Sequence, residues 1–397
     1  MNHPIFHLKA HRDEALLRGH PWIFSRALRD PQTALPPGTI VDIHDAADHF
    51  VARGYYNPQT DIAVRILTRD PAEDVDATLI ADRVRRALRL RQPFLHETHT
   101  NAYRLINAEG DFLPGAIVDR YDDVLVAQIS TAGMELLTGD LVAALREVIN
   151  PASIVLRNDV ASRAREGMER ERTRLAWGAE TPPLIEIREN DLIYTVDVWT
   201  GQKTGFFLDQ RDKRRALAKY VAGRTVLNTF SYTGAFGVVA AVAGATHVTS
   251  VDQSGPVVAH ARTQFTLNGQ DPDAHEFLVG DAFAQLEKWV AAGQRFDVVI
   301  LDPPAFAKTL SAKPQALRAY RRLNALGLRC LNPGGLLVTC SCSGAVTMDE
   351  FVGVLNEAAQ REGRVMQTAE MFTHGLDHPN LLAMPESGYL KVLFCRA

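Results

Sequence analysis

Residues 225–252 read TVLNTFSYTGAFGVVAAVAGATHVTSVD, and this stretch decides the fold class. It begins with a short apolar run, 225–229, and ends with another, 247–252. An apolar segment of helical length, 234–243, lies between them and follows a loop that contains glycine. Strand, helix and strand in this order predict a parallel pair joined by a crossover helix. We therefore expect an α/β fold with a ligand-binding loop at the start of that helix.

The same alternation continues to the end of the chain. Apolar runs predict strands at 276–279, 296–301, 335–339, 365–371 and 389–395. Amphipathic segments predict helices at 254–268, 282–292, 314–331 and 348–362. Only a loop with turn residues joins the last two strands, so the final strand is expected to run antiparallel. Seven strands with an antiparallel last one form the Rossmann-like sheet of class I methyltransferases, not the all-parallel dinucleotide-binding sheet.

The upstream part of the chain has a different pattern. Short β-like runs at 38–43, 49–53 and 62–67 predict a small β-barrel-like domain over residues 1–73. A central α/β domain is expected over 74–190, and the domain with the seven-stranded sheet over 191–397. From residue 75 to residue 198 we expect an arginine-rich helix at 75–92, a helix at 136–148, and strands at 115–119, 124–129, 154–157 and 192–198.

Composition excludes several classes of protein. No apolar run approaches the roughly 20 residues that cross a bilayer, and the N-terminus does not resemble a signal peptide, so we expect a cytoplasmic protein. A net charge of −4 argues against a protein that coats nucleic acid nonspecifically, although a local basic surface still permits selective binding. Two basic clusters occur, and we expect them to be solvated helix faces. They are Arg83, Arg85, Arg86, Arg89 and Arg91, and Arg211, Lys213, Arg214 and Arg215.

The four cysteines all lie in the last quarter of the chain. A disulfide framework needs more cysteines in a shorter secreted chain. Cys340 and Cys342 are separated by one residue, which is too tight for the usual zinc spacing. We therefore expect reduced thiols, of which one is reactive, and no metal site.

Acidic residues end three of the expected strands. Asp252 follows the second strand, where an acid can hydrogen-bond ribose hydroxyls, and Asp281 follows the third, beside the place of an adenine. Asp302 follows the fourth. Gly234 and Gly237 allow a close approach of the backbone to a ligand, but they do not form the Gly-x-Gly-x-x-Gly of dinucleotide binders. The pattern favours an adenosine cofactor other than NAD.

Longer motifs make the resemblance specific. In the C-terminal half they are Lys203-Thr-Gly-Phe-Phe-Leu-Asp-Gln-Arg211, Phe230-Ser-Tyr-Thr-Gly-Ala-Phe236, Asp302-Pro-Pro-Ala-Phe306 and Ser341-Cys-Ser-Gly344. Upstream they are His20-Pro-Trp-Ile-Phe-Ser25, Gly54-Tyr-Tyr-Asn-Pro58, Arg104-Leu-Ile-Asn-Ala-Glu-Gly110, Leu113-Pro-Gly115 and Arg165-Glu-Gly167. Together they resemble the bacterial large-subunit ribosomal RNA methyltransferase I family over essentially the whole chain.

This resemblance implies S-adenosylmethionine as the cofactor and 23S ribosomal RNA as the partner, with 5-methylcytosine as the product. It also implies that the first domain is an RNA-binding PUA domain and that the enzyme is a homodimer. Carried over residue by residue, it implies a cofactor site made of Asp209, Gln210, Arg211, Asn228, Phe230, Ser231, Tyr232, Thr233, Gly234, Phe236, Asp252, Gln253, Asp281, Ala282 and Asp302.

The chemistry of cytosine C5 accounts for a thiol and an acid. C5 is a poor nucleophile until a thiolate adds to C6. By resemblance Cys342 is the nucleophile, and Asp302 stabilises the charge that develops on the ring. Pro303, Pro304 and Phe306 are expected to contact the substrate. The second cysteine that many RNA cytosine methyltransferases carry is replaced by Ala305, which leaves the base that removes the C5 proton unidentified.

Cys340 is interpreted as a packing residue, since thiols are common in cores.

Two alternatives to methylation of cytosine C5 stay open. The nearest rival activity is N-methylation of an exocyclic amine in RNA, because Asp302-Pro-Pro-Ala-Phe306 resembles the motif in which an acid and a prolyl carbonyl hold such an amine. The other is a noncatalytic RNA-binding protein with a degenerate nucleotide fold. Amine methylation needs no thiol, and a noncatalytic RNA-binding protein would not bind the cofactor.

Overall fold

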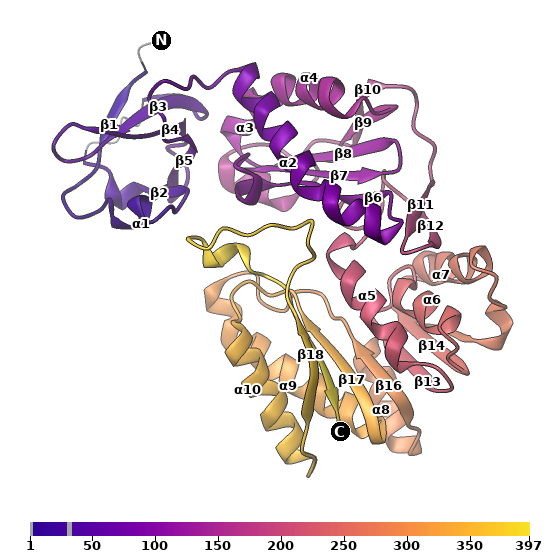
Figure 1. Cartoon of the computed structure of the whole chain (residues 1–397). Coiled ribbons are helices and arrows are strands. Elements are labelled where there is room, and N and C mark those ends of the chain that lie inside the picture. Colours follow the sequence, from indigo (N-terminus) through magenta and orange to yellow (C-terminus); the bar gives the residue numbers. More distant parts are fainter. Residues whose placement is uncertain (1–2, 30–33) are drawn as a thin grey trace. The chain divides into compact units, whose positions relative to one another are not determined.

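The computed structural model describes residues 3–29 and 34–397 and divides into two compact units (Figure 1). Unit 1 comprises Met1–Glu189, Thr195–Leu208 and Leu376–Ser387. Unit 2 comprises Asn190–Tyr194, Asp209–Gly375 and Gly388–Ala397.

Unit 1 begins with a five-stranded sheet in the order β1-β3-β4-β5-β2. The strands are β1 (Ile5–His7), β2 (Trp22–Phe24), β3 (Thr39–His44), β4 (Phe50–Tyr56) and β5 (Ile62–Thr68), with a short helix α1 (Glu14–Leu17). Alternate residues such as Val41 and Ile43 point into a core of their own. The three β-like runs of the sequence are β3, β4 and β5. The three-residue strands β1 and β2 are too short to give a pattern.

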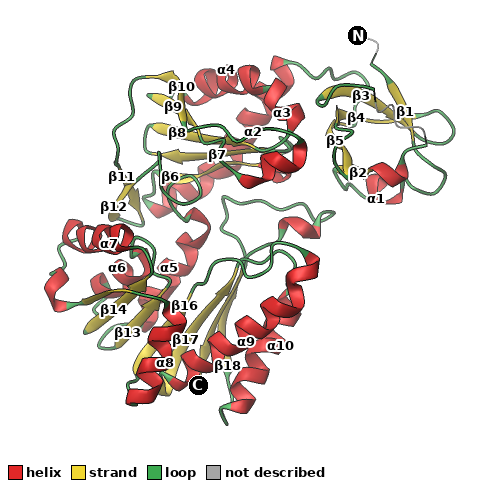
Figure 2. Cartoon of the chain, turned by 180° about the vertical axis from the view of Figure 1, so that it is seen from behind, coloured by secondary structure: helices red, strands yellow, loops and turns green. Residues whose placement is uncertain are grey.

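A second five-stranded sheet follows in unit 1, in the order β10-β9-β8-β7-β6. Its strands are β6 (Ala102–Asn107), β7 (Ala116–Tyr121), β8 (Val124–Ile129), β9 (Ser153–Leu156) and β10 (Arg174–Gly178). The helices α2 (Ala77–Thr98), α3 (Ala132–Leu136) and α4 (Thr138–Ile149) accompany it, and α2 and α4 lie side by side (Figure 2). The strands β11 (Ile185–Glu189) and β12 (Leu192–Val196) form a separate two-stranded sheet.

The arginine-rich helix is longer than the sequence indicated. We expected it to end before Pro93, but α2 continues through this proline to Thr98. The continuation buries Phe94, whose ring meets that of Tyr103 edge-on at 6.2 Å. Burial of an aromatic side chain stabilises enough to offset the hydrogen bond that a proline removes.

The basic clusters are not simply solvated faces. Arg91 is buried and forms a bidentate ion pair with Asp111, with contacts of 2.5 and 2.7 Å. Arg211, Lys213 and Arg214, in the second cluster, are also buried. For these residues the expectation is wrong, because tertiary partners remove them from water.

Unit 2 is built on a seven-stranded sheet in the order β15-β14-β13-β16-β17-β19-β18. The strands are β13 (Thr225–Thr229), β14 (His247–Asp252), β15 (Glu276–Val279), β16 (Phe296–Leu301), β17 (Leu331–Ser341), β18 (Gln367–Phe372) and β19 (Lys391–Arg396). Strand β19 runs antiparallel to both of its neighbours, and the other pairs from β15 to β17 are parallel. The predicted class I methyltransferase fold is confirmed. Strand β17 begins earlier than the predicted 335–339.

Helices cover both faces of this sheet (Figures 1 and 2). One group is α8 (Ala282–Ala292), α9 (Lys313–Arg329) and α10 (Met348–Arg361), which share a core with β16 and β17. The other is α5 (Arg211–Leu217), α6 (Ala235–Val242) and α7 (Gly255–Leu267), where α6 contacts both of the others. Among the described residues, no helix combines the length and apolarity needed to cross a membrane.

The segment between β18 and β19 belongs in part to unit 1. Within Leu376–Ser387, Asp377 is fully buried, and its carboxylate accepts the backbone N–H of Arg104 at 2.9 Å. The carbonyl of Asp377 accepts a hydrogen bond from the guanidinium of Arg91, also at 2.9 Å. A turn-rich loop is thus anchored by buried charged groups.

Candidate active site

The loop after β13 has an unusual backbone. Phe230 and Tyr232 have φ values of 55° and 47°, in the left-handed region that residues other than glycine rarely adopt. Gly234, with φ of 80°, immediately precedes α6, and a Cβ at this position would lie 2.9 Å from the Cβ of Ala261. Glycine is therefore required there for space as well as for conformation. Strained backbone of this kind concentrates at binding sites.

Buried polar atoms around this loop lack partners. Among the described residues, Asn228 Nδ2, Ser231 Oγ, Thr233 Oγ1 and Ser250 Oγ are buried and accept or donate no hydrogen bond. A buried polar group without a partner costs about 1–3 kcal/mol. Four such atoms next to a strained loop and a helix N-terminus are suited to a ligand rich in hydroxyl, amino and carboxylate groups. The residues present therefore fit an adenosine-containing cofactor.

The two acids beyond this loop differ in surroundings. Asp252 accepts the N–H of Tyr232 at 3.0 Å with one carboxylate oxygen and the N–H of Ser254 at 3.1 Å with the other. Asp281 is exposed and caps α8, because its side chain accepts the N–H of Ala284 at 2.9 Å. Strands β14 and β15 are neighbours, so both acids lie at the same edge of the sheet. Of the other predicted cofactor residues here, Gln253 is exposed, and Phe236 and Ala282 are buried.

Asp302 follows β16, and the segment just before α5 holds its carboxylate. The side-chain amide of the buried Gln210 donates to both carboxylate oxygens, at 3.1 and 3.0 Å. The preceding residue, Asp209, accepts the hydroxyl of Tyr389 at 2.7 Å, and its carbonyl accepts the ammonium of Lys213 at 2.7 Å. The predicted motif around Asp209, Gln210 and the buried Arg211 is therefore in place to orient Asp302. Its contact with a cofactor stays a prediction.

Cys342 lies just beyond the end of β17, and its Sγ is directed at the carbonyl oxygen of Pro303, 3.8 Å away. The thiol is half-buried. The next residue, Ser343, ties the two strand-end loops together: its hydroxyl accepts the N–H of Ala307 at 3.0 Å and meets the hydroxyl of Tyr320 at 2.9 Å. The fold therefore brings the predicted nucleophile and the Asp-Pro-Pro loop into contact.

The two neighbouring thiols have opposite environments. Cys340 is fully buried, and burial, followed by the negative charge of Asp302, raises its pKa well above the ordinary value of 9.0. A thiol in that state is a poor nucleophile near neutral pH. Cys330 and Cys395 are buried as well, with pKa values raised chiefly by burial. Cys342 alone among the four cysteines is partly accessible.

A buried lysine stands beside Cys342. Lys391, at the start of β19, is 3% exposed, and its ammonium donates to three carbonyl oxygens: those of Ser343 and Val346 at 2.7 Å and that of Tyr389 at 2.8 Å. Burial lowers its pKa to about 8, while a negative charge on Cys342 acts in the opposite direction. The ammonium therefore fixes the loop after Cys342.

The predicted substrate residues are less uniform. Phe306 is half-buried and packs on Tyr320 and Phe283, with ring centroids 4.7 and 6.2 Å away. Pro303 is buried and Pro304 is exposed. Phe306 can present one face at the site while the other belongs to the core.

Sequence reasoning missed Lys391 and Tyr389. The signal for Lys391 was a single charge inside an otherwise apolar strand, Tyr389-Leu-Lys-Val-Leu-Phe-Cys395. A lone cation in such a run is expected to serve a buried acceptor. Tyr389 carried no such signal, because its bond to Asp209 joins residues 180 positions apart.

Comparison with known families matches two parts of the chain. A family model for S-adenosylmethionine-dependent methyltransferases covers residues 160–396. A model for PUA-like domains covers residues 6–69.

Individual proteins match nearly the whole chain. A Photobacterium profundum protein named ribosomal RNA large subunit methyltransferase I is 40% identical over 385 residues, 97% of each chain. A protein of the same name from Escherichia coli O139:H28 is 39% identical over 385 residues, also 97% of each chain. A solved Streptococcus mutans protein described as a putative S-adenosylmethionine-dependent methyltransferase superposes with a TM-score of 0.86 at 26% identity, covering 99% of this chain and 100% of that one. A methyltransferase solved in complex with SAH gives the same score and identity over 100% of both chains.

Proposed function

This chain belongs to the ribosomal RNA large subunit methyltransferase I family, is S-adenosylmethionine-dependent, and, we propose, methylates C5 of a cytosine in 23S ribosomal RNA. The observation that carries the choice of C5 is the half-buried thiol of Cys342, whose Sγ lies 3.8 Å from the carbonyl of Pro303. Methylation of an amine would not need this thiol.

The chain's own residues account for the steps on the base. S-adenosylmethionine supplies an electrophilic methyl group when bound. The thiolate of Cys342 adds to C6, so that the C5=C6 double bond opens and C5 becomes nucleophilic toward that methyl. The ammonium of Lys391 fixes the loop after Cys342. The carboxyl of Asp302, oriented by Gln210, hydrogen-bonds the N3/N4 edge of the ring. Loss of the C5 proton then restores the double bond and releases Cys342.

The cofactor is proposed to lie over the 230–237 loop. Asp252 would bind the ribose hydroxyls with the lone pairs that its two backbone contacts leave open. Asp281 would flank the adenine, and Asn228, Ser231 and Thr233 would supply partners for the remaining polar groups. These roles match the surroundings of each side chain.

Trapping the covalent adduct tests this mechanism. A 23S ribosomal RNA transcript with 5-fluorocytosine in place of cytosine is expected to remain attached to the enzyme in denaturing electrophoresis, because fluorine at C5 cannot leave as a proton does. The adduct should require S-adenosylmethionine, persist in Cys340→Ser, and disappear in Cys342→Ser. The matched pair of variants separates the nucleophile from a thiol two residues away.

Amine methylation is the second candidate, and one contact bears on it. The prolyl carbonyl that would hold an exocyclic amine is the Pro303 carbonyl, which faces Cys342 Sγ. In the free protein this carbonyl is therefore occupied by the thiol, which an exocyclic amine would have to displace. Undiminished methylation of unmodified RNA by Cys342→Ser, with no adduct in the wild type, would transfer the assignment to the amine.

We also propose that residues 1–73 select the RNA, that 74–190 form a central domain and 191–397 the catalytic domain, and that the enzyme acts as a homodimer. The PUA-like match to residues 6–69 and the separate core of the first sheet support the first role. A chain lacking residues 1–73 should keep its cofactor affinity and lose most RNA methylation. Deleting residues 1–73 also removes Asn57 and Arg65, the partners of the buried Glu166, so unchanged cofactor affinity is the control which shows that the remaining chain is folded. A larger truncation would in addition strip Arg91 and Arg104 from Asp377. Light scattering tests the dimer.

A further inference from the structure

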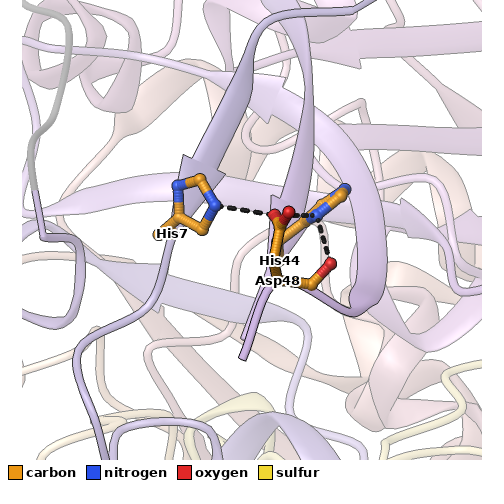
Figure 3. A group of neighbouring side chains, drawn as sticks. All are labelled: His7, His44 and Asp48. Carbon is orange, nitrogen blue, oxygen red and sulfur yellow. Dashed lines mark hydrogen bonds and ion pairs between the residues drawn. The ribbon is translucent and has the colours of Figure 1, made fainter. Parts of the chain in front are cut away.

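Two histidines and an aspartate converge at one end of the first sheet (Figure 3). His7 is the last residue of β1 and His44 the last of β3, and the parallel register places them opposite each other. Asp48 comes from the turn between β3 and β4, and one of its carboxylate oxygens lies 2.9 Å from His7 Nε2 and 2.9 Å from His44 Nδ1. The two strands and the turn thus fix all three side chains.

Asp48 is not required for the turn itself. The carboxylate of Asp45 closes the turn by accepting the N–H groups of Ala47 at 2.8 Å and His49 at 2.9 Å. Asp48 has a φ of 70°, which Asp and Asn tolerate better than most residues. Its side chain is directed at the two rings, and among the described residues it forms ion pairs only with them. The carboxylate therefore serves the histidines and not the backbone.

The donor set matches the preferences of one class of ion. Two imidazoles and a carboxylate suit Zn²⁺ and related first-row divalent cations. Zinc bonds of about 2.0–2.2 Å to nitrogen and oxygen place tetrahedral ligand atoms about 3.3 Å apart. Here the ligand atoms all lie within 4.8 Å of one another, and two of the pairs are 2.9 Å apart. Small side-chain movements would open a tetrahedral site.

The site is also accessible. The side chains of Asp48, His7 and His44 are 73%, 36% and 16% exposed, so an ion can enter and a water molecule can take the fourth position. The most buried of the three is His44, whose Nδ1 lies 3.0 Å from the carbonyl of Asp48, and the ion would replace the proton of this contact.

We propose that His7, His44 and Asp48 bind a divalent cation of the zinc class and thereby fasten β1 to the β3–β4 turn. Strand β1 is a three-residue strand at the edge of the sheet, paired with β3 and with the N–H of Arg29, which the carbonyl of His7 accepts at 2.8 Å. A short edge strand gains much from a crosslink, so the ion stabilises the PUA-like domain. The proposed role is structural and does not depend on the methyltransferase chemistry.

Cobalt titration of the full-length chain tests the proposal, with no histidine tag and after removal of metal by a chelator. Co²⁺ is expected to bind with a stoichiometry of one and to give the visible absorption of a tetrahedral site, and Zn²⁺ should displace it. Thiolate ligation would add an intense charge-transfer band. The absence of this band would exclude Cys342 as the ligand. Asp48→Asn should weaken binding at least tenfold, because an amide is a far poorer ligand than a carboxylate.

Asp48→Asn is chosen because asparagine keeps the left-handed backbone and can still accept a hydrogen bond from an imidazole. Its stability without metal should therefore equal that of the wild type, while the rise in melting temperature on adding Zn²⁺ is lost. His44→Gln provides a second loss variant. His49→Gln is the control, since His49 pairs with Asp45 in the same turn and is 78% exposed. Equal Co²⁺ binding by wild type and Asp48→Asn, loss of binding in His49→Gln, or no binding by the wild type would each overturn the proposal.

Discussion

The two halves of the candidate active site are built on different principles. The cofactor half, at the ends of β13, β14 and β15, leaves Asn228 Nδ2, Ser231 Oγ and Thr233 Oγ1 buried without partners among the described residues. In the target half, at the ends of β16 and β17 and the start of β19, side chains bind one another, as Gln210 binds Asp302. A ligand would supply the missing bonds of the first half, whereas most of the bonds of the second already exist in the free protein, although the buried Gln210 Oε1 also lacks a partner among the described residues.

This difference teaches where each kind of substitution acts. Removing a ligand-binding group in the cofactor half should lower affinity, because the lost bonds exist only in the complex. Removing a group in the target half should lower turnover, because the loops that hold Cys342 and Asp302 depend on bonds already present in the free protein. Variants that mix the two effects would break the comparison.

The largest expected effect is in the target half. Cys342→Ser should lower methylation at least 10³-fold, which corresponds to about 4 kcal/mol, since a hydroxyl is far less ionised than a thiol near neutral pH. Affinity for S-adenosylmethionine, measured by calorimetry, should stay within about twofold. Cys340→Ser is the matched control and should keep most activity, because Cys340 is buried and poorly ionised. Loss in Cys340→Ser alone would mean that the other thiol is the nucleophile.

Lys391 should give the next largest effect, and pH reveals it. Its pKa is about 8, lowered by burial, so the folded protein loses this charge as pH rises through 8. Turnover should fall over this pH range, because the ammonium holds the loop after Cys342 by donating to three carbonyl oxygens. Lys391→Met should lower turnover about 10- to 100-fold below pH 8 and should abolish the fall of turnover as pH rises through 8.

The stability of the protein should move in the opposite direction. Between pH 8 and 10.5 the unfolded chain still binds the lysine proton while the folded chain does not, so the contribution of Lys391 to stability rises over this range. Activity that falls while thermal stability holds or rises would distinguish lost catalysis from unfolding. A rate that is flat from pH 7 to 9.5 would remove Lys391 from the mechanism.

In the cofactor half, Asp252→Ala should lower affinity for S-adenosylmethionine about tenfold or more, because ribose hydroxyls lose their acceptor at roughly 1–3 kcal/mol. Turnover at saturating cofactor should change much less. Asp252→Asn helps to interpret this result, since its side-chain oxygen still accepts one of the two backbone bonds that shape the loop. Unchanged calorimetric affinity in a folded Ala variant would exclude Asp252 from the site.

The sheet of unit 2 could be predicted because its strands are short apolar runs that end in acids, glycines or thiols. The carboxyl ends of such strands meet at one edge of the sheet, so the sequence correctly predicts that Asp252, Asp302 and Cys342 lie at strand ends. The antiparallel β19 followed from the absence of a crossover helix. These features are local in the chain and need no tertiary knowledge.

What could not be predicted depends on distant partners. Strand β6 was missed because Arg104 interrupts its apolar pattern, yet this arginine is buried against Asp119 with a contact of 2.5 Å. The Gln210 contacts with Asp302 span 92 residues. Asp377 is buried for the same reason, since Arg91 and Arg104 supply its hydrogen bonds. A charged residue is therefore exposed, as its sequence suggests, only when the fold brings no oppositely charged or hydrogen-bonding partner to it from a distant part of the chain.

The smallest effect is expected at Asp281, where two roles can be separated. Its exposed side chain caps α8 through the N–H of Ala284, so Asp281→Ala should lower the free energy of unfolding by about 1 kcal/mol. Asp281→Ser keeps a capping oxygen and should retain stability. If the carboxylate also flanks the adenine, both variants should bind S-adenosylmethionine a few-fold more weakly by calorimetry. Full affinity in the Ser variant would leave Asp281 as a helix cap alone and confine the acidic part of the cofactor half to Asp252.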